Sequence, residues 1–204
     1  MGSWRLIVDP PGDPAANMAA DERISRTALE ESRPILRIYG WDRPAISLGR
    51  RQAETDLPES MLRRGLPLVR RPTGGGAVSH RADEFTYAFA ARKEDLPPGL
   101  PLREIACYLH RRLRETAEKR GWIVAGEITL CGGDPSGPAP VCFSAPAHGD
   151  LIHRGVKVAG AALRVWKDRV LVQGSIQGIP LRRDQLVEAF KKTAEKGFNA
   201  EGEI

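Results

Sequence analysis

Three consecutive glycines, Gly74-Gly75-Gly76, constrain the fold of this 204-residue chain more than any other feature. Inside a helix or strand each glycine costs roughly 0.5–1 kcal/mol relative to alanine, so a run of three is disfavoured there. Such a run is expected where the backbone must approach a ligand, because bare N–H groups can hold a phosphate or an oxyanion. A flexible hairpin loop is the alternative interpretation. Arg70, Arg71 and His80, which flank the glycines, favour a binding site.

The glycine segment matches neither of the common nucleotide-binding motifs. No Gly-Lys-Ser/Thr follows it, as a Walker loop requires, and no Gly-x-Gly-x-x-Gly stands at a strand-to-helix turn. The segment therefore predicts a site of another kind.

Hydrophobic periodicity and turn residues predict more strands than helices. The predicted strands are residues 4–8, 35–41, 46–48, 66–70, a strand carrying Phe85, Tyr87 and Phe89, and a meander of 150–153, 156–166 and 169–176. The predicted helices are 14–32, 58–64, 101–120 and 183–196, and the predicted loops are 72–80 and 131–140. Because strands and helices do not alternate strictly, the pattern favours an α+β fold.

Composition narrows the class of protein. The length suits one domain, and three cysteines at wide spacing do not resemble a disulfide framework, which favours a reducing cytoplasm. The N-terminus lacks the apolar region of a signal peptide, and no apolar run is long enough to cross a membrane. The net charge of +5 is spread over predicted helix faces, so we expect acidic protein partners, and neither nucleic acid nor membrane.

Several motifs together resemble the superfamily of lipoate-protein ligases, octanoyltransferases and biotin protein ligases. The glycine segment follows that family's Arg-Arg-x-x-Gly-Gly-x-x-Val-x-His pattern from Arg70 to His80. Further resemblances, in the same order along the chain, are residues 17–22 (NMAADE), 36–41 (LRIYGW), 47–49 (SLG), 84–87 (EFTY), 141–146 (VCFSAP) and 157–160 (KVAG).

The resemblance implies a fold and an activity. The fold would be mixed, largely antiparallel sheets packed with helices, with residues 1–204 forming a single catalytic domain and no separate C-terminal accessory domain. The motifs are most similar to the cysteine-dependent octanoyltransferases of lipoate assembly. Those enzymes move an octanoyl or lipoyl group from a carrier thioester to a lipoyl-domain lysine without a cofactor. The implied partners are acyl carrier protein and lipoyl domains, or the glycine cleavage carrier protein. We expect a cytoplasmic monomer, or a complex with an accessory subunit.

Two alternatives stay open. One is an ATP-dependent lipoate-protein ligase that uses ATP and Mg with lipoate, with or without an accessory subunit. The other is a non-catalytic relative that binds lipoyl domains. The second is motivated by residues 160–163, which read Gly-Ala-Ala-Leu where the family has Gly-Ser-Ala-Gln.

The resemblance also assigns site residues. Cys142 would be the nucleophile, and Lys157 the cation that favours its thiolate and polarises the acyl carbonyl. A small buried hydrophobe is the other interpretation of Cys142. No metal site is predicted, because Cys142, His148 and His153 do not have zinc-ligand spacing. The predicted substrate-binding residues are Arg70, Arg71, Gly74, Gly75, Gly76, Ala77, His80, Tyr39, Tyr87 and Gly160. Both tyrosines, with Phe85 and Phe89, could line an acyl channel or simply pack in the core.

Overall fold

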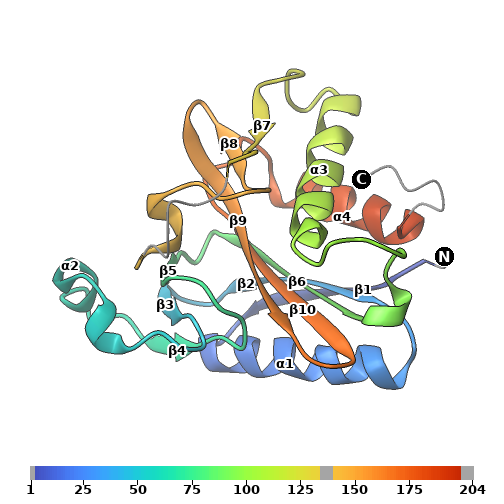
Figure 1. Ribbon diagram of the computed structural model, residues 1–204. Helices are drawn as coiled ribbons and strands as arrows, with labels where there is room; N and C mark the ends of the chain where they lie inside the picture. Colours follow the sequence, from blue (N-terminus) through green and yellow to red (C-terminus); the bar gives the residue numbers. More distant parts are fainter. Residues whose placement is uncertain (1–2, 134–139, 199–204) are drawn as a thin grey trace.

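The structure is a computed structural model and describes residues 3–133 and 140–198. At its centre is a seven-stranded sheet with the strand order β1-β2-β6-β10-β9-β8-β7 (Figure 1). The first two strands of that order are parallel and all other neighbours are antiparallel, which confirms the predicted α+β fold with a mixed, largely antiparallel sheet. The strands are β1 (Arg5–Gly12), β2 (Ile35–Trp41), β6 (Phe85–Arg92), β7 (Ile128–Leu130), β8 (Leu151–His153), β9 (Val156–Val165) and β10 (Arg169–Ile176).

A second, three-stranded sheet lies beside the first, in the order β4-β3-β5. Its strands are β3 (Ala45–Leu48), β4 (Leu68–Arg70) and β5 (Val78–His80). The prediction that residues 72–80 are entirely loop is wrong at its end, because β5 pairs antiparallel with β3 and buries Val78 and His80. The loop is thereby limited to the proline and glycine residues that cannot continue a strand.

Helices cover both faces of the large sheet. Helix α1 (Pro14–Glu30) lies along one face, while α3 (Glu104–Lys119) and α4 (Arg183–Lys196) pack together on the other (Figure 1). Strand β2 is buried along its whole length, as expected for a strand with helices on both sides. The shorter helices are η1 (Glu54–Asp56), α2 (Glu59–Leu62), η2 (Lys93–Asp95) and η3 (Cys142–Ser144). Within the described ranges, no helix is long and apolar enough to span a bilayer.

Local sequence signals explain where the elements near the site begin and turn. The carboxylate of Asp13 accepts hydrogen bonds from the N–H groups of Ala15 and Ala16, which caps α1. Strands β8 and β9 are joined by Arg154 and Gly155, both with positive φ (51° and 78°), as the predicted two-residue hairpin turn requires. This turn fixes the register that brings the first residues of β9 beside β8. The predicted loop 131–140 lies partly outside the described residues, at 134–139.

Candidate functional site

Cys142 and Lys157, 15 residues apart in sequence, meet at one end of the large sheet. The Lys157 Nζ lies 3.7 Å from the Cys142 Sγ and donates a 2.8 Å hydrogen bond to the carbonyl oxygen of Cys142. Cys142 begins η3 and is half-buried, whereas Lys157 on β9 is only 8% exposed. An ammonium held at this distance stabilises a thiolate electrostatically. The contact supports the chemistry predicted for both residues, but their catalytic roles stay predictions.

Asp150 holds the lysine in place, and the sequence did not single it out. Its Oδ2 accepts a 2.7 Å ion-pair bond from the Lys157 Nζ and a 2.6 Å bond from the N–H of Ala147. The ion pair with Asp150 and the two contacts with Cys142 together occupy the three N–H donors of the Lys157 ammonium. The sequence offers one signal for Asp150: it is an acidic residue directly before β8, the strand that forms a hairpin with β9, where Lys157 lies.

Gly160 makes room for the lysine side chain. A Cβ added at Gly160 would lie 2.4 Å from the Lys157 Cε and 2.8 Å from its Nζ, distances that are sterically forbidden. The Lys157 side chain therefore runs directly over the backbone of residue 160. The structure thus explains why the predicted site residue at position 160 is a glycine, because any larger residue would displace the Lys157 ammonium.

The triglycine loop lies along the same groove as Cys142 and Lys157. The buried Arg71 guanidinium donates hydrogen bonds to the carbonyl oxygens of Gly74 and Gly76, the latter at 2.7 Å. Within residues 3–133 and 140–198, the amide N–H groups of the three glycines have no hydrogen-bond acceptor. Burial lowers the pKa of Arg71, and attraction by the charge on Cys142 opposes that effect. The loop can therefore offer free N–H donors to an anionic ligand or to a developing oxyanion.

The loop and the nucleophile are joined through their backbones. The N–H of Cys142 donates to the carbonyl oxygen of Ala77, and the N–H of Ala77 donates to the carbonyl oxygen of Pro140, each at 2.9 Å. These two bonds make a short parallel bridge between Ala77 and Val141. The predicted site residue Ala77 thus positions Cys142 through its main chain.

A small cavity of about 30 Å³ lies behind Cys142, between β9, β10 and the three-stranded sheet. Its walls include Tyr39, Arg71 and His80, together with Phe143 and the small residues Gly160, Ala161 and Ala162. Sites for small-molecule ligands usually measure about 300–1,000 Å³, so this cavity is too small for an acyl chain unless its walls move.

His80 forms part of the wall and is tied to it by three contacts. Its ring stacks on Trp41 at 3.8 Å between centroids, its Nε2 lies 2.7 Å from the Ser47 Oγ, and its Nδ1 lies 2.6 Å from the Glu84 carboxylate. With both ring nitrogens occupied and only 4% exposure, His80 has no free nitrogen for a reacting group. The geometry indicates that it orders the wall.

Two predicted substrate-binding residues lie away from the cavity. Arg70 points outwards and donates to the backbone oxygens of Gly49 and Gln52. Tyr87 packs on the sheet face covered by α3 and α4, whereas Tyr39 belongs to the cluster on the α1 face. The sequence pattern could not distinguish these faces, because strands with helices on both sides are apolar throughout.

The comparison with family models decides the relationship. The description "Lipoyl protein ligase A/B catalytic domain" matches residues 13–200. The chain belongs to this family. An octanoyltransferase LipM of Exiguobacterium is 37% identical over 186 residues, covering 85% of this chain and 65% of the relative. Another octanoyltransferase LipM, of Moorella thermoacetica, is 37% identical over 198 residues, covering 95% of this chain and 71% of the relative.

Solved structures agree on the fold of this lipoyl-ligase family domain. The crystal structure of a lipoate-protein ligase A bound with ATP superposes with a TM-score of 0.71, covering 94% of this chain and 84% of that one at 18% identity. At this identity the likeness shows the fold alone. The chain spans about two thirds of the length of the octanoyltransferase relatives, 65% and 71%.

A buried hydrogen-bonded chain connects the site of this family domain to its core. The Nδ1–H of His110, on α3, donates a 2.6 Å bond to the carbonyl oxygen of Gly149, so its Nε2 is left to accept from the Tyr87 hydroxyl at 2.9 Å. Burial lowers the pKa of His110, which keeps the ring neutral, and raises the pKa of Tyr87. Because Gly149 immediately precedes Asp150, the chain helps to position the carboxylate that holds Lys157.

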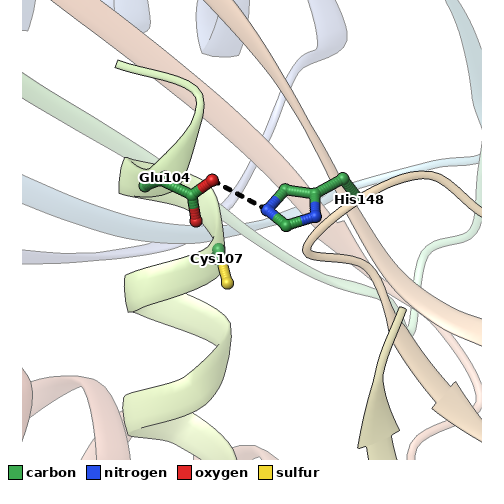
Figure 2. A group of neighbouring side chains, drawn as sticks. All are labelled: Glu104, Cys107 and His148. Atoms are coloured by element: carbon green, nitrogen blue, oxygen red, sulfur yellow. Dashed lines mark hydrogen bonds and ion pairs between the residues drawn. The ribbon is translucent and has the colours of Figure 1, made fainter. Parts of the chain in front are cut away.

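A second contact fixes the same loop to α3. Figure 2 shows Glu104 and Cys107 on the helix facing His148, whose Nε2 lies 2.9 Å from the Glu104 Oε1. The three donor atoms lie within 4.8 Å of one another, as metal ligands would. Two guanidinium groups lie beside the cluster, Arg111 at 3.7 Å from the Cys107 Sγ and Arg103 at 3.6 Å from the Glu104 Oε1, and their positive charge opposes a bound cation. We therefore interpret the cluster as a contact that fixes the loop before Asp150.

Proposed function

We propose that this domain transfers an octanoyl or lipoyl group from a carrier thioester to a lysine of a lipoyl domain, through a thioester on Cys142. One observation carries the proposal: the Lys157 Nζ lies 3.7 Å from the Cys142 Sγ, in a groove bordered by the triglycine loop. The octanoyltransferase names of relatives that match 85–95% of the chain support the same activity.

The first half-reaction places the acyl group on the enzyme. The Cys142 thiolate attacks the carbonyl carbon of the carrier thioester, a new carbon–sulfur bond forms, and the bond to the carrier sulfur breaks. The proton that the Cys142 thiol has lost ends on the departing carrier thiol. The Lys157 ammonium and the free N–H groups of Gly74–Gly76 can stabilise the negative charge that develops on the carbonyl oxygen.

The second half-reaction transfers the group to the acceptor. The neutral amine of a lipoyl-domain lysine attacks the Cys142 thioester, an amide bond forms, and the cysteine leaves as a thiolate. The surplus proton of the amine returns to that thiolate, so the enzyme is regenerated without an oxidant, a metal or ATP. Lys157 stays close to the sulfur through both steps and favours its departure as an anion.

The experiment incubates the purified domain with octanoyl acyl carrier protein in the absence of ATP and analyses the intact protein by mass spectrometry. We expect one octanoyl adduct, located on Cys142 by peptide mapping, and its transfer to an added lipoyl domain. Cys142→Ala should form no adduct. Cys107→Ala and Cys131→Ala, which change the other two free thiols, are the matched controls and should still form it. An adduct that persists in Cys142→Ala would overturn the proposal.

The ATP-dependent ligase is the second candidate, favoured by the fold shared with an ATP-bound lipoate-protein ligase A. In that case the basic groove beside the triglycine loop would hold the phosphate of an acyl-adenylate, and Lys157 would contact its acyl carbonyl. Free lipoate with ATP and Mg separates the two. Lipoylation that requires ATP and is unaffected by Cys142→Ala would favour the ligase. Binding of a lipoyl domain with no acyl transfer from any donor would favour a non-catalytic relative.

A further inference from the structure

Three arginines border the groove outside Cys142. The groove has a volume of about 900 Å³, and Arg50, Arg51 and Arg164 lie along it with the triglycine loop, Cys142 and Lys157. Arg50 and Arg164 also border an adjoining hollow, so they stand where the two depressions meet. A ligand that reaches Cys142 through this groove would therefore pass their guanidinium groups.

Within the described part of the chain, none of these three arginines forms an ion pair with a carboxylate. Several other surface arginines have a carboxylate partner, as in Arg63–Glu59, Arg81–Asp83 and Arg182–Asp184. No described carboxylate lies within ion-pair distance of Arg50, Arg51 or Arg164. The two acidic residues of the groove are already engaged: Asp150 binds Lys157, and Asp56 accepts from the N–H of Ala53.

Two contacts orient the guanidinium group of Arg164, as a binding residue requires. It is half-buried, its guanidinium stacks 4.1 Å above the Trp166 ring, and it reaches the carbonyl oxygen of Pro72 at 3.5 Å. Burial, followed by repulsion from Arg50, lowers the pKa of Arg164, while Glu22 acts in the opposite direction. Two guanidinium groups that repel each other across an open groove would gain from an anion placed between them.

We propose that Arg50 and Arg164 bind the phosphodiester of a phosphopantetheine arm while the thioester at the end of that arm meets Cys142. The inference rests on the proposed function, since carriers present acyl groups as thioesters of such an arm. Guanidinium groups form bidentate bonds with phosphate oxygens, and the arm would lie along the groove while the carrier protein stays outside. The arm would thus be oriented by its charge at one end and by Cys142 at the other.

The test compares two small donors, octanoyl-pantetheine and octanoyl-4′-phosphopantetheine, which differ only in the phosphate. The measured quantity is kcat/KM for acylation of Cys142, followed by mass spectrometry. For the unmodified domain we expect the phosphorylated donor to be preferred by about 10- to 100-fold, the range of a charged hydrogen-bonded contact. The preference should decrease as salt is raised.

The variants locate the preference. In the double variant Arg50→Ala/Arg164→Ala the ratio between the two donors should fall to near one. In the charge-matched control Arg63→Ala/Arg182→Ala, which removes two exposed arginines with carboxylate partners of their own, it should be retained. Because Arg164 packs on Trp166, the exposed Arg50→Ala alone is the second variant and should lower the ratio in part.

The outcomes separate this inference from the function beneath it. If neither donor acylates Cys142, and octanoyl carrier protein also fails, the proposed function is wrong. If both donors acylate it equally well, or the double variant keeps the preference, the transfer activity stands and the phosphate site is wrong. Octanoyl-adenylate serves as a third donor. If the double variant is impaired only with this donor, the arginine pair belongs to an adenylate site and the inference is again overturned.

Discussion

Two buried ion pairs of this domain have similar geometry and different surroundings. Arg37 and Asp21 meet at 2.6 Å beneath α1, and Lys157 and Asp150 meet at 2.7 Å at the start of β9. In the first pair every neighbour is a fixed partner: Arg37 also binds Asp9 and Asn17, while Tyr39 and Gln173 donate to Asp21. We call this pair closed, because each of these contacts is with another side chain of the domain.

The second pair is buried but borders a groove. The remaining donors of Lys157 reach the carbonyl oxygen and the sulfur of Cys142, which is half-exposed. A reacting group that enters the groove therefore meets a cation whose position is already set. We therefore expect loss of one partner of the first pair to affect mainly stability, and loss of Lys157 to affect mainly the proposed acyl transfer.

The largest expected effect comes from breaking the closed pair. Arg37→Met should destabilise the domain by about 3–5 kcal/mol, because it leaves the Asp21 carboxyl buried without its cation. Burial already raises the pKa of Asp21, so the residual stability should depend on pH. Chemical denaturation measures the loss, and acylation per folded molecule should stay within a few fold. A variant as stable as the unmodified protein would show that the closed pair is dispensable.

Breaking the second pair, Lys157–Asp150, which we call the open pair because it borders the groove, should reduce activity much more than stability. Lys157→Met should slow acylation of Cys142 by about 100- to 1,000-fold, comparable with the loss of one group that stabilises a developing charge. Rapid-mixing mass spectrometry with octanoyl carrier protein gives the rate. Asp150→Asn, which keeps the lysine but removes its anionic partner, is the intermediate control. Acylation by Lys157→Met at the normal rate would contradict the role assigned to the open pair.

The smallest effect concerns the histidine behind the open pair. Burial lowers the pKa of His110 below its ordinary 6.5, so the unfolded chain binds this proton more readily than the folded one. The stability that its neutral form provides is complete above pH 6.5 and is lost as the pH falls towards the folded-state pKa, with a slope of up to about 1.4 kcal/mol per pH unit.

The variant His110→Gln isolates the contribution of His110 protonation to the free energy of unfolding, because glutamine can still donate to the carbonyl oxygen of Gly149 but does not titrate. Denaturation curves of both proteins between pH 5 and 8 should diverge on the acidic side, with the unmodified protein losing more stability. Parallel curves would mean that His110 binds its proton equally well in the folded and the unfolded protein, so that folding does not lower its pKa.

The sequence predicted most of the fold because its signals are local. The Asp13 cap places α1, and the Arg154-Gly155 turn places β8 beside β9, which also places Lys157. Strand β5 and strand β7 were missed, and each has only three residues. Their partners, β3 and β8, are distant from them in the sequence. Three residues carry too little periodicity to be recognised.

The site was predicted less completely, for a physical reason. Cys142 and Lys157 were found through family motifs, and their contact depends on a tertiary bridge from Ala77 to Val141 that no local pattern contains. Asp150 was missed because its carboxylate reaches Lys157 only through a register shift at Leu151. Tyr39 and Tyr87 were grouped together because a strand buried on both faces is apolar at every position. Its hydrophobic pattern therefore does not show which residues share a face.

The nearly filled cavity behind Cys142 has a consequence for selectivity among donors. If the proposed octanoyl tail enters this cavity, of which about 30 Å³ is empty, it would have to displace Phe143 or neighbouring atoms of β9. Discrimination between tails of different length would then arise from the work of opening the cavity wall, and acylation would have a large activation enthalpy. A preformed slot would instead impose a sharp steric limit on tail length, and the discrimination would depend little on temperature.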